Sequence, residues 1–146
     1  NTEYTVYIDY AHTPDAVLNV ISTVKEVCDG KIYTVFGCTG DRDRTKRPIM
    51  TKIVTDLSKK VIITNDDLHY ENPNQIVEDM INGLKNKNYE IILDRKEAIK
   101  KAITFLNKAI YVVYLPTISN IGQVKLYTTN FFNGIFLILF LSINKT

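Results

Sequence analysis

The sequence predicts an α/β domain, with a mostly parallel sheet and helices on both faces. Short apolar segments rich in β-branched residues alternate along the chain with segments whose apolar residues recur at helical spacing. Parallel neighbouring strands need a crossover connection, and a helix is its usual form. The alternation is therefore typical of a parallel sheet.

Five segments have the character of strands. All are short, and valine, isoleucine and tyrosine dominate them. They are "YTVYID" (4–9), "KIYTVFG" (31–37), "KVIIT" (60–64), "YEIIL" (89–93) and "AIYVVYL" (109–115).

The first two helices are expected between these strands. Thr13 is the predicted N-cap of the first, with Pro14 at the first helical position, and Asp29-Gly30 ends it. Its apolar stripe is Val17, Leu18, Ile21, Val24 and Cys28. The second helix begins near Pro48, and its stripe is Met50, Ile53, Val54 and Leu57.

Two further helices are predicted from capping patterns. Asn72 caps the third, with Gln75 three residues later, and Asp94 begins the fourth, with Glu97 three residues later. The third should bury Ile76, Val77, Met80, Ile81 and Leu84 and end near Gly83. The fourth should bury Ile99, Ala102, Ile103 and Leu106.

Length and composition indicate one globular domain. The chain has 146 residues, 45% of them hydrophobic and 23% charged. Its formal net charge of +2 is too small to indicate nucleic acid or an anionic membrane as a partner. Two cysteines, Cys28 and Cys38, are too few for a disulfide framework, so a reducing compartment is expected. No secretory signal opens the sequence.

Residues 116–146 are expected to form a divergent tail after a domain at residues 1–115. Charges become rare beyond Lys108, and "FFNGIFLILFLSI" (131–143) is a dense apolar run. A helix needs about 20 apolar residues to span a bilayer, so no membrane span is expected. A buried strand or helix is preferred, and truncation or a frameshift would also produce such a tail.

Three polar segments follow the first three predicted strands: "DYAHTPD" (9–15), "GCTGDRDRTKR" (37–47) and "NDDLHYEN" (65–72). The carboxyl ends of parallel strands share one edge of the sheet, and ligands bind in the crevice there. We therefore expect these segments to converge on a binding site. The segment after the fourth strand is a plain capping sequence.

The second of these segments has two glycines followed by charges of alternating sign. Gly37 and Gly40 make neither a Walker P-loop nor the dinucleotide Gly-x-Gly-x-x-Gly fingerprint. The charged residues form either a solvated loop with weak local ion pairs or a supporting loop from which an arginine binds a carboxylate or phosphate bidentately. They are Asp41, Arg42, Asp43, Arg44, Lys46 and Arg47.

The other two segments also admit two interpretations. Asp9 and His12 are either a turn former and a packing histidine, or they hold a ribose hydroxyl and a phosphate. Asp66, Asp67 and His69 are either turn residues or a site for an ammonium group. Paired acids at the carboxyl edge of the sheet are suited to binding such a group.

Metal and covalent chemistry have little support. The histidines and cysteines lack metal-ligand spacing, so no metal site is expected. A nucleophilic pair of Cys38 with a histidine is left open, although no spacing favours it. A phosphatase with Asp9 as nucleophile is a weaker alternative, because no second Asp follows at the usual two-residue spacing.

Three stretches together resemble a known family. "YIDYAHTPDAV", "TVFGCTGDRDRTKRPIM" and "ITNDDLHYENP", in this order, resemble the C-terminal, Rossmann-like domain of the Mur ligases, of the UDP-N-acetylmuramoyl-tripeptide synthetase type. The resemblance covers roughly residues 4–108. Folylpolyglutamate synthases share an Asp-x-Ala-His start but would not be expected to carry the second stretch in this form.

The resemblance implies a cytoplasmic, ATP- and Mg²⁺-dependent amide ligase of peptidoglycan synthesis. Such enzymes phosphorylate the carboxylate of UDP-MurNAc-L-Ala-D-Glu, and the amine of meso-diaminopimelate or L-lysine attacks the acyl phosphate. The matching positions place Asp9 and His12 at ATP and Arg42 on an amino-acid carboxylate. The central ATPase domain, which carries the P-loop and is expected to hold most of the Mg²⁺ contacts, and the N-terminal domain are missing from this sequence.

The sequence departs from the family pattern at two places in the site. Asp66-Asp67-Leu68-His69 stands where diaminopimelate-adding members carry Asp-Asn-Pro-Arg, and "YLPTISNIGQVKLYTTN" (114–130) replaces the Gly-Lys-Gly-His-Glu segment. Two hypotheses follow. Either the chain is a ligase domain that works only beside the missing domains, or it is a stand-alone or vestigial binding module without ligase activity.

Overall fold

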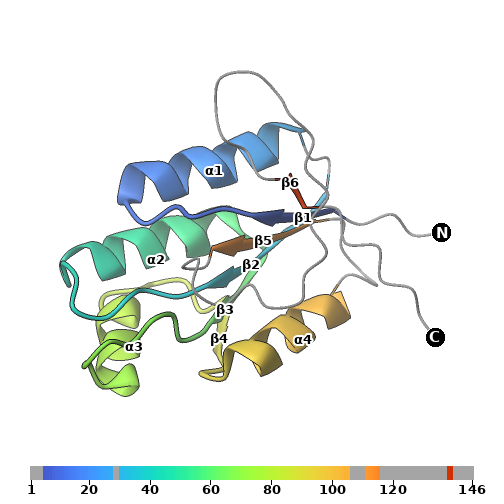
Figure 1. Cartoon of the computed structure of the whole chain (residues 1–146). Helices are drawn as coiled ribbons and strands as arrows, with labels where there is room; N and C mark the ends of the chain where they lie inside the picture. The colour runs from blue at the N-terminus through green and yellow to red at the C-terminus, as the bar shows by residue number, and fades with distance from the viewer. Residues whose placement is uncertain (1–4, 28–29, 106–110, 116–137, 140–146) are drawn as a thin grey trace.

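The computed structural model describes residues 5–27, 30–105, 111–115 and 138–139. Within them the chain forms one sheet in the order β4-β3-β2-β5-β1-β6 (Figure 1). The strands are β1 (Thr5–Ile8), β2 (Ile32–Phe36), β3 (Lys60–Ile63), β4 (Tyr89–Ile91), β5 (Tyr111–Leu115) and β6 (Ile138–Leu139). The five expected strands are confirmed, and β1 to β5 pair in parallel.

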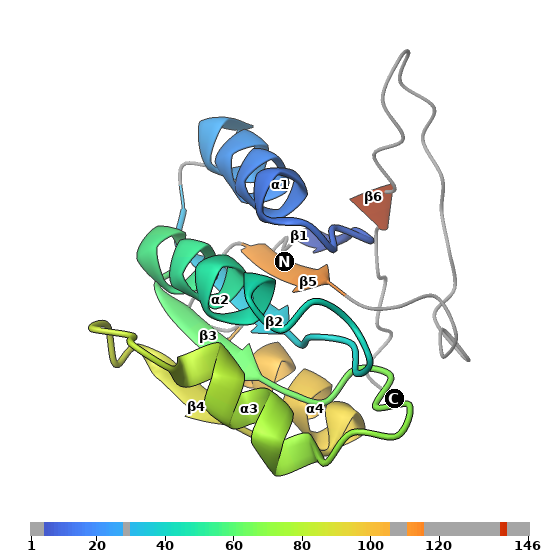
Figure 2. The same cartoon turned by 90° about the vertical axis from the view of Figure 1, so that its left-hand side faces the viewer.

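Helices cover both faces of the sheet, as predicted (Figure 2). They are α1 (Pro14–Val27), α2 (Lys46–Leu57), α3 (Pro73–Ile81) and α4 (Arg95–Phe105). α1, α2 and α3 pack on one face around Phe36, Val61 and Ile63. α4 packs on the other, where Ala98 and Ala102 meet Val35 and Ile62. Burying apolar side chains on both faces is the main favourable contribution to the stability of such a fold.

Two helix starts follow the predicted caps. The backbone N–H of Ala16 donates to the Thr13 hydroxyl at 3.3 Å, and that of Asn74 donates to the Asn72 side chain at 2.9 Å. Each cap satisfies an N–H that the helix itself leaves without a partner. α2, by contrast, begins at Lys46, two residues before the predicted Pro48.

Three predicted core positions are wrong. Leu18 on α1, and Ile99 and Ile103 on α4, are exposed. On α4 the predicted burial of Ala102 is confirmed, and Ala98 is buried beside it. Their small side chains let the helix approach the sheet closely. Predicted core residues Cys28 and Leu106 lie outside the described residues.

In the expected tail, β6 pairs antiparallel with β1, aligning Ile138 with Tyr7 and Leu139 with Val6. Residues 116–137 and 140–146 lie outside the described residues, so the domain boundary expected at residue 115 stays a prediction. In the described part of the chain, no helix is both long and apolar enough to cross a membrane.

Candidate functional site

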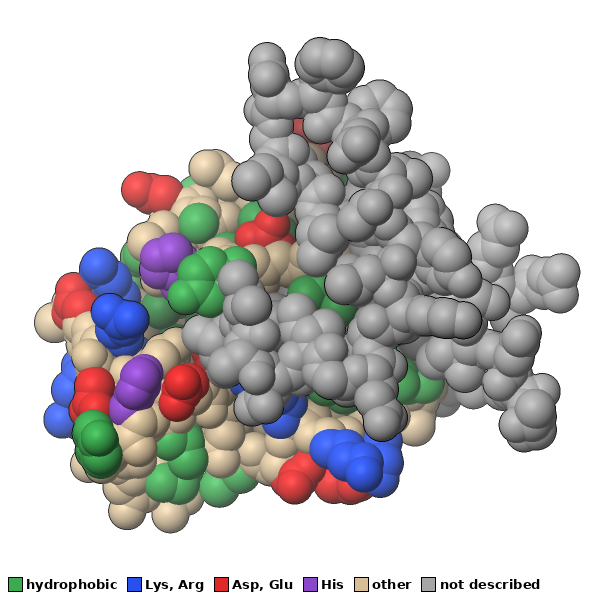
Figure 3. Space-filling view, viewed as in Figure 1, with side chains coloured by type: hydrophobic (Ala, Val, Ile, Leu, Met, Phe, Trp, Pro, Cys, Tyr) green, Lys and Arg blue, Asp and Glu red, His purple; other side chains and the backbone are tan. Residues whose placement is uncertain are grey.

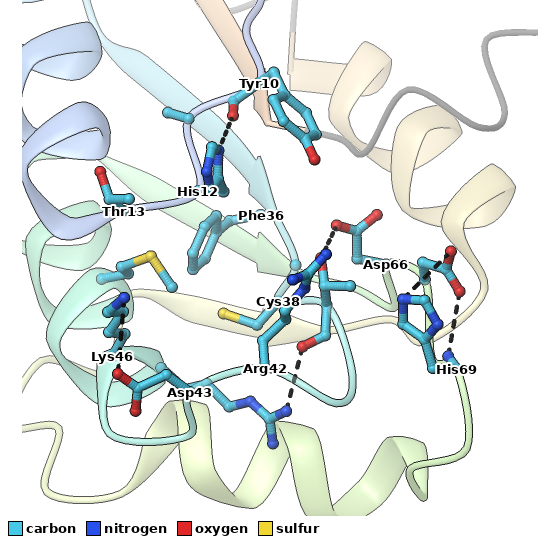
Figure 4. A pocket seen from close by; sticks show the side chains of 16 residues that line it. Tyr10, His12, Thr13, Phe36, Cys38, Arg42, Asp43, Lys46, Asp66 and His69 are labelled. Carbon is cyan, nitrogen blue, oxygen red and sulfur yellow. Dashed lines mark hydrogen bonds and ion pairs between the residues drawn. The ribbon is translucent and has the colours of Figure 1, made fainter.

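A pocket of about 670 Å³ lies at the carboxyl ends of β1, β2 and β3 (Figure 4). It brings together side chains from the three polar segments, as the topology predicted. The lining includes Tyr10, Ala11, His12, Thr13, Phe36, Gly37, Cys38, Thr39, Arg42, Asp43, Lys46, Arg47, Met50, Asp66, Asp67 and His69. On the side of the molecule where these loops lie, charges of both signs and histidine gather at the surface (Figure 3).

The two glycines let the loops after β2 and β3 approach each other. A Cβ on Gly37 would lie 2.6 Å from the carbonyl oxygen of Thr64, and one on Gly40 would lie 2.0 Å from that of Leu68. The N–H of Gly40 also donates to the Asp67 carbonyl at 2.7 Å. The absence of a side chain at both glycines therefore permits close backbone contact between the two loops.

Arg47 lies beneath this pair of loops and is 1% exposed. Its guanidinium donates to both carboxylate oxygens of Glu71 at 2.8 Å, to Asp79 Oδ2 at 2.8 Å and to the Thr39 carbonyl at 3.2 Å. Its Nε is buried without a partner among the described residues. A buried charge is tolerated only when it is paired and hydrogen-bonded, and two carboxylates supply this here.

The two carboxylates are held in their charged form. Hydrogen bonds from Arg47 lower the pKa of Glu71 to about 2, and those from Arg44 and Arg47 lower the pKa of Asp79 to about 2. Arg44 meets Asp79 through Nε at 2.8 Å and Nη2 at 2.9 Å. The cluster thus joins the loop after β2, the first turn of α2, the loop after β3 and α3.

The predicted supporting loop therefore divides into different roles. Lys46 and Arg47 belong to α2, so assigning them to a loop was wrong. Asp43 accepts from the N–H of Thr45 at 3.0 Å and from its hydroxyl at 2.6 Å, just before α2 begins. Lys46 Nζ lies 3.7 Å from Asp43 Oδ2 at the pocket, and Arg44 points to Asp79 instead.

Arg42 is the cation that these contacts leave available. It lines the pocket and is exposed, and among the described residues it makes no ion pair. Its neighbour Asp41 has a left-handed backbone, with φ of 51°. An exposed guanidinium of this kind can bind a carboxylate or phosphate with two parallel hydrogen bonds.

Asp66, Asp67 and His69 all line the pocket. Figure 4 shows Asp66 and His69 on the side opposite α1. Asp66 is paired within the protein: one carboxylate oxygen meets Arg95 Nη2, the other accepts from Thr39 Oγ1 at 3.1 Å, and its side chain is 5% exposed. Asp67 and His69 are more open, with 3.8 Å between Asp67 Oδ2 and His69 Nε2. Of the two acids, Asp67 is the accessible one.

Asp9 and His12 are placed differently from each other. His12 lines the pocket, its Nδ1–H donates to the Tyr10 carbonyl at 3.0 Å, and its ring lies 4.9 Å from the Tyr10 ring. Asp9 is half-buried and outside the pocket lining, and its burial raises the pKa of its carboxyl.

Cys38 lines the base of the pocket but is buried, and desolvation raises the pKa of its thiol to about 12. A thiol with such a pKa is a poor nucleophile at neutral pH, so the nucleophilic alternative for Cys38 is not supported. Within the described residues, no three His, Cys, Asp or Glu side chains form a cluster that could hold a metal ion.

Glu71, Asp79 and Arg95 were not predicted as part of the site. Glu71 and Asp79 lie 24 and 32 positions from Arg47, and Arg95 lies 29 positions from Asp66. No local pattern marks such pairs. The one available signal was the number of arginines in the segment 37–47, which exceeds what its own aspartates can neutralise.

Comparison with known proteins identifies this arrangement. The family described as "Mur ligase, glutamate ligase domain" matches residues 1–117, most of the chain. The chain belongs to the Mur ligase family. The family resemblance and the fold class expected from the sequence are thereby confirmed.

Individual Mur ligases match the same region. The UDP-N-acetylmuramoyl-L-alanyl-D-glutamate–2,6-diaminopimelate ligase of Bacillus cereus is 52% identical over 100 residues, covering 68% of this chain and 20% of the relative. Ligase 1 of that name from Clostridium acetobutylicum is 47% identical over 108 residues, which cover 74% of this chain and 22% of the relative. A solved structure of a ligase with the same name superposes with a TM-score of 0.67 at 41% identity, covering 76% and 23%. The chain thus spans about a fifth of the curated relatives that it matches.

Proposed function

We propose that this domain completes the active site of an ATP-dependent ligase that adds 2,6-diaminopimelate to UDP-MurNAc-L-Ala-D-Glu. The observation that carries the proposal is the exposed Arg42, which has no ion pair within the described part of the chain and shares a pocket with the accessible Asp67 and His69. The chain that holds this pocket is about half identical to ligases named for that reaction. The names of these relatives favour diaminopimelate over L-lysine, the other diamino acid that the resemblance allows.

The proposed reaction forms an amide in two steps. ATP supplies the phosphoryl group that activates the dipeptide carboxylate as an acyl phosphate. The amine of the diamino acid then attacks that carbonyl, phosphate leaves and the nitrogen loses a proton. The reaction takes place in the cytoplasm, as the family resemblance implies.

The residues of this chain contribute positioning to that reaction. Arg42 binds a carboxylate of the diamino acid, and Asp67 with His69 lines the part of the pocket that receives its polar groups. Holding an amine against an activated carboxyl converts an encounter into a nearly unimolecular step, a large source of rate acceleration. Asp66 supports this wall through Arg95 and Thr39, which is a different role from the direct contact first expected.

His12 and Asp9 are assigned to the ATP side of the site. His12 faces the pocket from the loop after β1, where a phosphate or ribose can reach it. The described residues offer no cluster of metal ligands, so we assign Mg²⁺ mainly to the central domain of the complete ligase. The UDP-MurNAc-dipeptide likewise contacts this chain only within that complete enzyme.

The proposal is tested in a chimera. The matched segment of the Bacillus cereus ligase is replaced by the corresponding segment of this chain, and ATP-dependent ligation of diaminopimelate and of L-lysine is measured. Ligation that prefers diaminopimelate, with a KM for it that rises in an Arg42→Ala variant, is expected. A folded chimera that ligates neither amino acid contradicts the proposal and favours a vestigial or binding module.

A further inference from the structure

We propose that Arg47 and Glu71 are positioning residues that hold Arg42 in its binding orientation. The inference rests on the proposed function, because it concerns how Arg42 reaches the amino acid. Neither residue would touch the substrate. Arg47 is 1% exposed, and both terminal nitrogens of its guanidinium donate hydrogen bonds to Glu71.

The backbone just before Arg42 is held at two points. Arg47 Nη2 donates to the carbonyl of Thr39 at 3.2 Å, and Glu71 Oε1 accepts from the N–H of Asp41 at 2.7 Å. The same Nη2 meets Glu71 Oε1 at 2.8 Å. One guanidinium and one carboxylate therefore fix the chain both three residues and one residue before Arg42.

The backbone at this point needs such support. Asp41 has φ of 51°, a left-handed conformation that a residue with a side chain rarely adopts. Uncommon conformations at functional sites persist when the surrounding structure over-determines them. The hydrogen bond from the Asp41 N–H to Glu71 holds this conformation, and this conformation directs the next residue, Arg42, toward the pocket.

The same pair also relates Arg42 to the opposite wall. Glu71 lies two residues after His69, which has φ of 46°. Between them, the N–H of Tyr70 donates to Asp41 Oδ2 at 3.3 Å. The loop that carries Arg42 and the loop that carries His69 are thus joined through Asp41 and Glu71, so one network sets the spacing of both walls.

Lysine cannot replace Arg47 in this role. The planar guanidinium contacts Glu71, Asp79 and the Thr39 carbonyl at once, whereas a lysine ammonium is a single point charge on a flexible stem. Arg47→Lys keeps the charge and removes this geometry. It is therefore the variant that separates positioning from simple neutralisation of the two partly buried acids.

The first experiment uses the chimera and measures KM for each substrate. Arg47→Lys should raise the KM for diaminopimelate about 10-fold, since displacement of a positioning group by about 1 Å has effects of this order or larger. The KM for ATP should change less than about twofold, because the variant weakens the binding of diaminopimelate only. Lys52→Met is the matched control: it removes an exposed cation of the same helix, paired with Asp56, and should change neither KM.

A double-mutant cycle then decides whether Arg47 acts through Arg42. In an Arg42→Ala background, Arg47→Lys should add almost nothing to the KM for diaminopimelate, because the group that it positions is gone. Equal, multiplying effects in both backgrounds would overturn the inference. The inference would also fail if Arg47→Lys raised the KM for diaminopimelate and the KM for ATP equally, in proportion to a fall in the melting temperature.

A second measurement is independent of ligase activity. In the 146-residue chain, amide hydrogen exchange at Asp41 should be slow, and Glu71→Gln and Arg47→Lys should each accelerate it at least about 10-fold relative to the core amide of Val35. If Asp41 exchanges equally fast in all three proteins, the network does not hold the loop and the inference fails. If the chimera is inactive but Asp41 is protected as expected, the proposed function fails while the positioning of Arg42 by the network stands.

Discussion

The guanidinium of Arg47 donates to both carboxylate oxygens of Glu71 over nitrogen–oxygen distances of 2.8 Å. This pair connects the first turn of α2 with the loop after β3, and Asp79 adds α3 to the same group. Three separate elements around the pocket therefore depend on one buried side chain. The contacts of Arg47 with Glu71 and Asp79 therefore contribute both to the stability of the fold and to the geometry of the pocket.

Removing the cation should destabilise the fold. Arg47→Met leaves the carboxylates of Glu71 and Asp79 close together without their shared partner, and breaking a buried pair in this way costs about 3 kcal/mol. Urea unfolding of the 146-residue chain measures the loss. Lys52→Met removes a cation with a 69% exposed side chain from the same helix and should change the free energy of unfolding by less than about 0.5 kcal/mol. Equal losses in the two variants would contradict the assignment.

Acid should weaken the protein through the same two carboxylates. Their pKa values fall from 4.5 for Glu71 and 3.8 for Asp79 to about 2 in the folded state, so the unfolded chain binds protons first as the pH falls. The resulting stabilisation is fully present above about pH 5 and is lost as the pH approaches 2. Urea unfolding from pH 6 to pH 2 should show a shallower decline for Glu71→Gln and Asp79→Asn than for the parent. Parallel declines would show that these acids are not responsible.

Alanine at two glycines should have different consequences. Gly40→Ala would place a Cβ 2.0 Å from the Leu68 carbonyl, so the loops after β2 and β3 must separate. At Gly83, a Cβ would meet none of the described residues within 4 Å, so Gly83→Ala bears the strain of φ at 73°, about 1 kcal/mol. Both stability and the amide shifts of Asp41 and Asp67 should therefore change in Gly40→Ala, whereas Gly83→Ala should leave those shifts unaltered. The comparison uses urea unfolding and amide NMR spectra.

Cys38 should be unreactive in the folded protein. Burial raises the pKa of its thiol to about 12, so almost no thiolate exists at pH 8. Labelling with Ellman's reagent in a Cys28→Ser background counts this thiol alone. Slow labelling that becomes rapid in urea is expected, and labelling of the native protein at the rate of a free thiol would show that Cys38 is accessible.

Local signals predicted much of the fold. The five strands came from β-branched runs, and Thr13 and Asn72 cap their helices through bonds to residues within three positions. α4 shows the limit of such signals. Ala102 was correctly expected to be buried, but Ile99 and Ile103 were expected there too, and Ala98 is buried in their place. Helical spacing alone does not decide which neighbours of Ala102 face the sheet, because that depends on how closely the helix can approach.

The site was predictable to the extent that topology determines it. Parallel strands placed the three polar segments along one edge, which brought Arg42, His12 and His69 to one pocket. Ion pairing between distant segments could not be predicted, because it depends on side-chain positions in three dimensions. Asp66, expected to contact a ligand, pairs with Arg95 instead, and Arg47 pairs with two acids that had no assigned role.

The proposed binding of an amino-acid carboxylate by Arg42 can be tested directly. In the chimera, the KM for diaminopimelate is compared with the KM for its two mono-carboxamide analogues, before and after Arg42→Ala. We expect the KM for one analogue to be about 10-fold or more above that for diaminopimelate in the parent chimera, because a charged bidentate contact is lost, and we expect Arg42→Ala to abolish this difference. If that analogue keeps its higher KM after Arg42→Ala, Arg42 does not bind the amino-acid carboxylate, and the role proposed for it is wrong.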